Sequence, residues 1–418
     1  MPDRSPHRSP RSRRHLAPAA VVLAYLVVGA VAAAVGEGWL ALHLVLLGGA
    51  TNAIVVWSEH FAAALLHARP GGSGFALARL LALNLAVVAV LSGVQGGRTA
   101  LVAAGAALLV VVVLVHAAGL AARIRRALAT RLGDTVWFYV AAASALVAAT
   151  GLGLLLAGGG ASSADGYRAI RLAHAHLNVL GWIGLAVLGT QFTLWPTMLR
   201  TRMVPGLLAA SRAAFLLTVG GLGLATAGLL GQHRALAVTG LAGYVAGLGA
   251  ALVPFARTLL GRRPPRSYRA GGGLAAPWML GLGIGWFALA VAADLAALLG
   301  VGRVVDLDAS LGRLVPVVAV GFGLQVLAGA LTYLLPTVWG RGAHGNRRLT
   351  ELLETAWPVR VAALNAGTAA VAAGPAGGWV ALAGRTLIGL GLGSFVVLAA
   401  TALVQRVLED ARPDAEAR

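Results

Sequence analysis

The chain is 418 residues long; 59% of its residues are hydrophobic and only 11% are charged, which excludes an ordinary soluble enzyme and a disordered chain. Cysteine is absent, so disulfides, thiolate metal sites and a cysteine nucleophile are excluded. Any metal or redox chemistry would have to use His, Asp, Glu or Met. The net charge is +19, a value that in a soluble protein would suggest a nucleic acid or another anionic partner.

Apolar runs of about 20 residues predict membrane-spanning helices, because a helix of that length crosses the hydrocarbon core of a bilayer. The 57 glycines fall largely within these runs, which predicts close packing of the helices against one another. The sequence holds twelve such runs, at residues 17–35, 39–66, 75–93, 99–121, 135–157, 172–198, 207–230, 235–259, 275–299, 312–338, 359–376 and 379–405.

The connections between these runs are too short to fold as separate domains. We therefore predict an all-α polytopic membrane protein of about 12 transmembrane helices. Its single membrane domain would cover residues 17–405. A basic cytoplasmic tail, residues 1–16, would precede this domain, and a short cytoplasmic tail, residues 406–418, would follow it.

The basic side chains, all of them arginines apart from the histidines, are distributed according to the predicted topology. If the N-terminal tail is cytoplasmic, seven of the 33 arginines fall on the outer side and the other 26 on the inner side. The positive-inside rule explains this distribution, so we expect the lipid bilayer, and no nucleic acid, as the partner. We expect the inner or plasma membrane of a bacterial cell, with both termini cytoplasmic. The seven outer arginines are Arg98, Arg168, Arg171, Arg234, Arg303, Arg313 and Arg385.

Three of the predicted spans share a sequence register. HLNVLGWIGLAVLGTQFTLWPT, which starts at His176, aligns at an offset of 140 with PVVAVGFGLQVLAGALTYLLPT, which starts at Pro316. HLVLLG, which starts at His43, aligns with HLNVLG at an offset of 133. Since the three matched spans are four spans apart, they predict three pseudo-repeated four-helix units around a threefold axis.

Three histidines at the outer ends of two spans form the candidate site. His43 in the second span and His174 and His176 in the sixth lie within about four residues of those ends, and therefore at similar depth. Ionisable side chains within a membrane are costly and suggest a buried polar site, and imidazole ligates both copper and haem iron. Because residues two apart point about 200° apart around a helix, His174 and His176 cannot face the same neighbour. The repeat register selects His176 as the inward one.

Two outer arginines, Arg171 and Arg313, immediately precede the sixth and tenth spans. This placement suits the two propionates of a haem held below them through charge-assisted hydrogen bonds. The alternative for these arginines is ordinary termination of a span. For the three histidines, the alternative is hydrogen bonding to the outer loops.

Four further ionisable residues lie in or near spans. Glu59 and His60 at the inner end of the second span, and His116 near the inner end of the fourth, are interpreted as snorkelling interfacial side chains. The alternative for Glu59 and His60 is a pair that admits protons. Asp294, in the outer half of the ninth span, is expected to bond to a neighbouring helix or to an outer arginine, with a proton relay as the alternative.

The chain resembles the catalytic subunits of haem–copper oxidases and nitric oxide reductases. In that superfamily a copper-ligating histidine in the sixth span is followed by a glycine and a proline at the spacing of His176, Gly189 and Pro196. The segment GALTYLLPTVWGR resembles the end of the family's tenth span, and His43 would match a haem-ligating histidine of the second.

The chain also departs from the family pattern. The two ligating histidines of the tenth span would fall on Leu314 and Pro316, and the histidine pair of the seventh span has no counterpart in residues 206–230. A complete oxygen-reducing centre is therefore not expected. A closer resemblance is to uncharacterised bacterial copper-oxidase-like membrane regions, through the strings at residues 43–61 and 180–202. Some of those regions are fused to a soluble multicopper oxidase or a nitrite-reductase-like module.

These resemblances imply a haem- or copper-binding membrane protein related to a degenerate haem–copper oxidase subunit I. Its ligands would be His43 and His176, with His174 assisting, and its cofactors would be haem b, copper or both. Such a protein would serve electron transfer, or copper or nitrogen-oxide handling, beside a soluble multicopper oxidase or another redox partner. If it is an enzyme, it would be a membrane oxidoreductase. The alternatives are a transporter of a small solute or metal ion, and a membrane anchor for a soluble redox partner.

Overall fold

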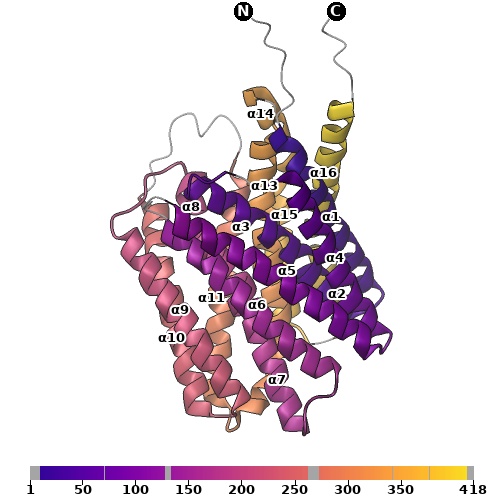
Figure 1. Ribbon diagram of the computed structural model, residues 1–418, viewed down its shortest axis with the longest axis vertical. Coiled ribbons are helices and arrows are strands. Elements are labelled where there is room, and N and C mark those ends of the chain that lie inside the picture. Colours follow the sequence, from indigo (N-terminus) through magenta and orange to yellow (C-terminus); the bar gives the residue numbers. More distant parts are fainter. Residues whose placement is uncertain are drawn as a thin grey trace, which may run out of the picture.

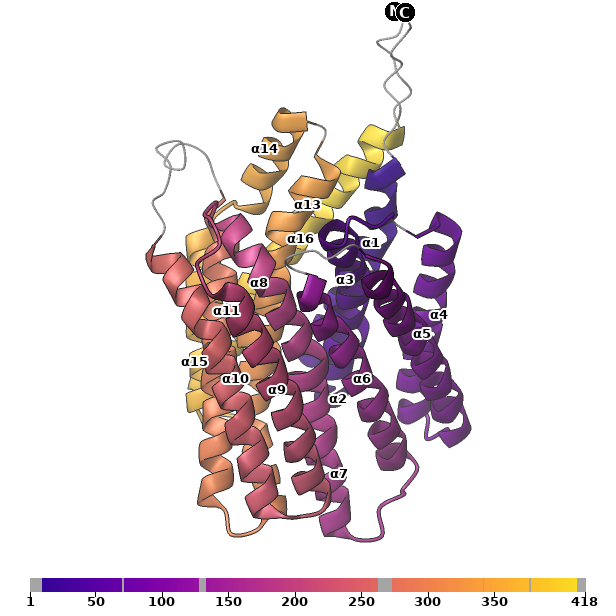
Figure 2. The same cartoon turned by 60° about the vertical axis from the view of Figure 1, so that its left-hand side comes forward.

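The computed structural model describes residues 10–69, 71–127, 133–261, 273–340, 342–375 and 377–411, and all regular structure in these ranges is helical. Eleven of the described helical stretches are long and apolar enough to cross a membrane. Figures 1 and 2 show these stretches running side by side along the long axis of the molecule, with the start of α1 and the end of α16 at the same end of the bundle. The prediction of an all-α polytopic membrane protein is confirmed.

The helices follow one another as three sets. The first set is α1 (Pro10–Ala34), the span α2–η1–α3 (Gly38–His43, Leu44–Ala50, Thr51–Leu65), α4 (Ser73–Gln95) and α5 (Thr99–Arg126). The second is η2 (Gly133–Thr135), α6 (Val136–Ala157), the span α7–η3–α8 (Ala164–His176, Leu177–Leu185, Ala186–Met198), α9 (Leu207–Leu230) and α10 (Arg234–Leu260). The third is α11 (Ala275–Gly300), η5 (Val304–Ser310), the span α12–η6–α13 (Leu311–Pro316, Val317–Leu324, Gln325–Trp339), α14 (Gly342–Leu353), α15 (Trp357–Ala373) and α16 (Trp379–Ala411).

The three sets repeat one packing plan. In each, the first span packs against the middle of the second, as α1 does on η1, α6 on η3 and α11 on η6. The last two spans form a helical hairpin, as in α4 with α5, α9 with α10 and α15 with α16. Glycine allows the closest of these approaches, because a Cβ at Gly240 of α10 would overlap the backbone nitrogen of Ala225 of α9. The prediction of close helix packing through glycine is confirmed at this crossing.

A π-helical segment interrupts the second span of every set. These segments, η1, η3 and η6, start one residue after His43, His176 and Pro316, the three positions that the sequence register aligns. The offsets of 133 and 140 between repeats are therefore also the offsets between π-helices, which confirms the register. Each π turn holds an extra residue and shifts the backbone hydrogen bonding from i+4 to i+5.

Polar side chains satisfy carbonyl groups within the π-helical segments. Asn52 Nδ2 donates to the Gly48 carbonyl at 2.8 Å, and Tyr244 Oη donates to the Leu180 carbonyl at 2.8 Å. Both donors are buried, where an unpaired polar group would be costly. The interruptions are thus supported by side chains from the same span or from a neighbouring one.

Two predicted boundaries need correction. The sixth span begins at Ala164 and not at residue 172, because Ser163 caps the helix by accepting from the Gly166 amide at 3.0 Å. The predicted run 359–376 is the 17-residue helix α15, shorter than the eleven long spans. Pro358 lies in the first turn of α15, and Gly374 follows its last residue, so residues typical of helix ends set both limits.

Candidate functional site

His176 is buried at the last residue of α7 and bonds to the neighbouring helix α11. Its Nδ1 donates to the Leu172 carbonyl one turn earlier at 2.8 Å, and its Nε2 lies 2.7 Å from Asp294 Oδ2. His176 is 5% exposed and Asp294 7%, so the pair is shielded from solvent. Asp294 Oδ1 has no hydrogen-bond partner among the described residues. The expectation that Asp294 bonds to a neighbouring helix is confirmed.

His43 occupies the equivalent position in the first set and makes the same local bond. Its Nδ1 donates to the carbonyl of Trp39, four residues earlier, at 2.8 Å. Trp39 and Leu172 are themselves 133 residues apart, so both the histidine and its acceptor repeat. The Trp39 indole stacks on the imidazole with ring centroids 4.2 Å apart, which fixes the orientation of the ring. Within the described residues, Nε2 of His43 has no hydrogen-bond partner.

His174 faces a different neighbour from His176, as predicted. Its Nδ1 donates to the Ala149 carbonyl of α6 at 2.9 Å. Gly153, one turn further along α6, makes room for the ring, since a Cβ there would lie 3.1 Å from its Cε1. The Asn178 amide lies 3.3 Å from His174 Nε2 and also donates to the His174 carbonyl at 2.8 Å. His174 lies near enough to His43 for the two rings to interact electrostatically.

The structure therefore divides the three predicted ligands into two groups. In His43 and His174, Nδ1 carries the proton that is donated to a carbonyl, so Nε2 presents a lone pair. A histidine that binds a metal through one nitrogen commonly donates its other N–H to a carbonyl, so both residues have the tautomer that a metal ion requires. Nε2 of His176 is held by Asp294 at 2.7 Å, whereas Nε2 of His174 has only the Asn178 amide, at 3.3 Å, which a metal ion would displace. Among the described residues, no group of three or more His, Asp and Glu side chains is arranged to hold a metal ion.

A haem fits these surroundings less well than a single ion does. The interior beside η3 is filled by aromatic side chains that are almost fully buried, and Phe287 stacks on Phe322 with centroids 4.2 Å apart. A Cβ at Gly184 would lie 2.8 Å from both the Phe287 ring and the Tyr244 hydroxyl, so no space remains there for a macrocycle. Leucine and proline, which occupy the tenth-span positions that ligate haem in the family, offer no ligand atom. The interior beside η3 therefore does not fit a haem.

The two arginines predicted to face haem propionates do not converge on the histidines. Arg171 Nε donates to Asp308 Oδ1 at 2.6 Å, and a second bond joins its guanidinium to Asp308 Oδ2. This ion pair links α7 to η5, so a propionate would have to displace a carboxylate. Arg313 in α12 is exposed and has no ion-pair partner within the described ranges.

The polar residues at the other end of the first set form a cluster of their own. Glu59 pairs with Arg79 and also with Arg123, whose nitrogen lies 2.5 Å from its Oε1. His116 Nε2 lies 3.0 Å from Ser58 Oγ, and its Nδ1 lies 3.4 Å from Arg79. At 3% exposure His116 is buried, so its prediction as a snorkelling interfacial residue was wrong. The residue occurs on the inward face of α5, where polar partners from α3 and α4 satisfy it.

His60 does not pair with Glu59, although the two are adjacent in sequence. Its ring meets His15 and Trp57 edge-on, at centroid distances of 5.3 and 5.4 Å. The two side chains point in different directions, because consecutive residues of an α-helix are about 100° apart around its axis. The alternative of a Glu59–His60 pair is therefore not what the structure shows. Glu59 instead points towards α4 and α5.

Sequence reasoning missed the partners of the site residues more than the residues themselves. The pairing of Asp294 with His176 was not predicted, although both were placed in the outer half of the membrane. Asn178 was not predicted at all, and an amide one turn after His174 was the available signal.

No model of a known protein family matches the sequence, and no curated protein matches it. The resemblance to haem–copper oxidases consequently rests on the motifs, the repeat and the histidines of the chain itself. What the protein does has to follow from its own side chains.

Proposed function

We propose that this integral membrane protein binds one copper ion through Nε2 of His43 and Nε2 of His174, near the end of the bundle opposite α14. The observation that carries the proposal is the shared tautomer: both rings donate Nδ1–H to a backbone carbonyl, so each has a lone pair on Nε2. The two rings are also near enough to interact electrostatically. Two neutral imidazoles suit Cu(I), which accepts low coordination numbers, and imidazole is a good ligand for copper in general.

The neighbouring residues hold these rings in place. Stacking on Trp39 fixes the plane of the His43 ring, and the bond from Nδ1 to the Ala149 carbonyl restricts rotation of His174. The bond between His176 and Asp294 ties α7 to α11 and so sets the rotation of the helix that carries His174. In this proposal His176 is a positioning residue and not a ligand. A copper ion bound here would supply one-electron redox chemistry.

We further propose the cellular setting that the arginine distribution supports: a bacterial inner or plasma membrane, with α14 and the end of α16 on the cytoplasmic side. The two histidines would then lie towards the outer face. A soluble multicopper oxidase or another redox protein on that face is the partner with which such a site would exchange electrons or copper.

The test is copper binding by the full-length protein in detergent, loaded anaerobically with Cu(I) and measured by elemental analysis and by competition with a chromogenic Cu(I) chelator. We expect one copper per chain in the wild type. We expect loss of that copper in His43→Ala and His174→Ala, because each removes half of the ligand set. His233→Ala is the matched control, since His233 is exposed in an outer turn.

Three results would contradict the assignment. Retention of copper in both single variants would place the ion elsewhere, and loss only in His60→Ala would place it at the His15–His60 contact. A Soret band in properly loaded protein would replace copper by haem. X-ray absorption that shows only light nitrogen or oxygen scatterers around copper is expected for the proposed site.

A second function, transport of a small solute or metal ion, is favoured by the buried His176–Asp294 pair. An ionisable pair within membrane-spanning helices is a frequent element of transport pathways. This function predicts histidine-dependent copper uptake into proteoliposomes. Stoichiometric binding without uptake would leave the resident copper site as the better assignment.

A further inference from the structure

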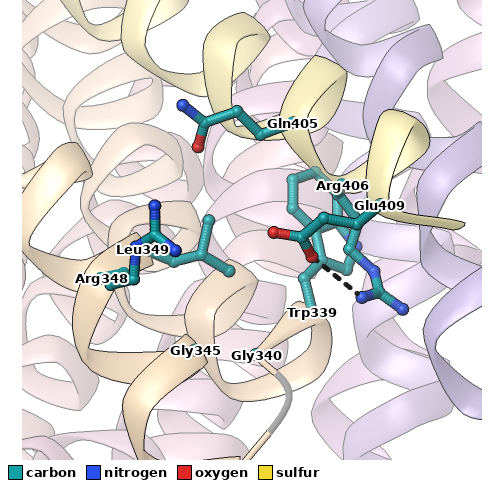
Figure 3. A pocket seen from close by; sticks show the side chains of 8 residues that line it. All are labelled: Trp339, Gly340, Gly345, Arg348, Leu349, Gln405, Arg406 and Glu409. Atoms are coloured by element: carbon teal, nitrogen blue, oxygen red, sulfur yellow. Dashed lines mark hydrogen bonds and ion pairs between the residues drawn. The ribbon is translucent and has the colours of Figure 1, made fainter. Parts of the chain in front are cut away.

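A pocket opens at the end of the bundle where α16 finishes, far from the histidines. It has a volume of about 250 Å³ and lies between the last turn of α13, the helix α14 and the end of α16. Figure 3 shows its lining, with Arg348 and Leu349 on one side and Arg406 and Glu409 on the other. Two candidate membrane spans end beside the pocket, at Trp339 and Glu409, as expected for a site at the level of the lipid headgroups.

Two donors of the lining, on Arg348 and Trp339, have no acceptor among the described residues. Arg348 is exposed and has no ion-pair partner within the described ranges, whereas its neighbour Arg347 bonds to Glu351 at 2.8 Å. Trp339 also lines the pocket; its side chain is 1% exposed, yet its Nε1–H has no acceptor among the described residues. A buried indole N–H without an acceptor is uncommon in a folded protein, and an oxygen atom of a ligand in the pocket would supply one.

The charges of the pocket restrict what that ligand can be. Arg406 lies 3.5 Å from Glu409, so these two side chains largely offset each other and Arg348 leaves a net charge of about +1. A monoanion is therefore preferred to a dianion, which the Glu409 carboxylate would repel. A phosphate group carries the oxygen acceptors that both guanidinium and indole N–H groups can bind. Basic pockets between membrane helices on the cytoplasmic side bind the headgroups of anionic lipids.

We propose that this pocket binds a phosphate group, either the monoanionic phosphodiester of an anionic phospholipid or free phosphate. Arg348 would pair with the phosphate, the Trp339 indole would donate to one of its oxygens, and the Gln405 amide is placed on the same rim. The proposal involves neither copper nor the histidines, so its test gives a result that is independent of the test of copper binding.

The test is native mass spectrometry of the delipidated full-length protein. The protein is titrated with phosphatidylglycerol and, for comparison, with diacylglycerol, which lacks the phosphate. A separate titration uses inorganic phosphate. We expect one phosphatidylglycerol to bind more tightly than diacylglycerol. Arg348→Ala should weaken this binding about tenfold or more, because a charge-assisted hydrogen bond is lost. Trp339→Phe, which keeps the ring and removes the donor, should weaken it several-fold.

Arg347→Ala is the matched control and should bind like the wild type, since its guanidinium is held by Glu351 on the same helix. Thermal unfolding of each variant shows whether it is folded before binding is compared. Suppose that inorganic phosphate binds, that Arg348→Ala abolishes this binding, and that the protein does not prefer phosphatidylglycerol to diacylglycerol. This result would support the site and assign it to free phosphate. Equal binding of phosphatidylglycerol to the wild type, Arg348→Ala and Trp339→Phe, without binding of phosphate, would overturn the proposal.

Discussion

The bond between His176 and Asp294 is predicted to be one of the largest single contributions to the packing of the second set of helices on the third. The two side chains are 5% and 7% exposed and their polar atoms are 2.7 Å apart. Removing either partner leaves the other buried without compensation, which typically costs about 3–5 kcal/mol. We therefore expect His176→Leu and Asp294→Leu each to destabilise the protein by about 3 kcal/mol.

The double variant separates this pairing from ordinary loss of packing. With both partners replaced by leucine no orphaned polar group remains, so the double variant should be less destabilised than the sum of the single ones by about 2–3 kcal/mol. The free energy of unfolding is measured in mixed micelles by titration with sodium dodecyl sulfate, followed by circular dichroism. The same cycle on the exposed pair Arg347–Glu351 should give a coupling of about 0.5 kcal/mol or less. Additive effects of the two leucine substitutions would refute the reasoning.

Two further predictions concern packing and charge elsewhere in the bundle. Gly240→Ala should lower the midpoint of thermal unfolding, because the added methyl group overlaps the backbone of α9 and overpacking costs about 1–3 kcal/mol. Gly249→Ala, on the open side of α10, should not lower it. Equal midpoints for the two variants would contradict the close approach of α9 and α10. Glu59→Gln should lower the free energy of unfolding, measured by titration with sodium dodecyl sulfate, by about 2–4 kcal/mol, because Arg79 and Arg123 lose the carboxylate between them. An unchanged free energy of unfolding would show that the two arginines do not depend on this carboxylate.

The fold could be predicted from the sequence because hydropathy is a local property of each segment. Eleven of the twelve predicted runs are long apolar helices, and the aligned positions His43, His176 and Pro316 were enough to find the repeat before any coordinates. Counting residues from the predicted start at 172 put His174 and His176 about two and four residues from the end of the sixth span, but the helix begins at Ala164, about two turns earlier, so this depth was wrong. That error arose because Ala164–Arg171 is too polar to count as part of an apolar run, yet it is helical and anchored to η5 by Arg171.

The partners of the histidines could not be predicted in the same way. Which neighbour a side chain meets depends on the rotation of its helix, and sequence patterns assume a uniform period of 3.6 residues per turn. The extra residue in each π turn breaks that period directly after His43 and His176 and rotates everything that follows by about 100°. A hydropathy profile does not detect the extra residue of a π turn. The pairing of His176 with Asp294 depends on how α11 sits beside α7, which no local pattern gives, whereas the opposite orientation of His174 required only that the helix be regular up to His176.

The repeat also shows why a histidine precedes the π-helix in only two of the three sets. In the first and second sets, the residue before the π-helix is a histidine whose Nδ1 donates to the carbonyl four residues earlier. The third set keeps the π-helix but has Pro316 at this position, and proline can neither donate nor ligate. The interruption of the second span is thus a property of the scaffold, while the imidazole is an addition that two sets carry. Pro316→His would accordingly leave the π-helix in place, and would test whether an imidazole at the third equivalent position makes the same bond to the carbonyl four residues earlier.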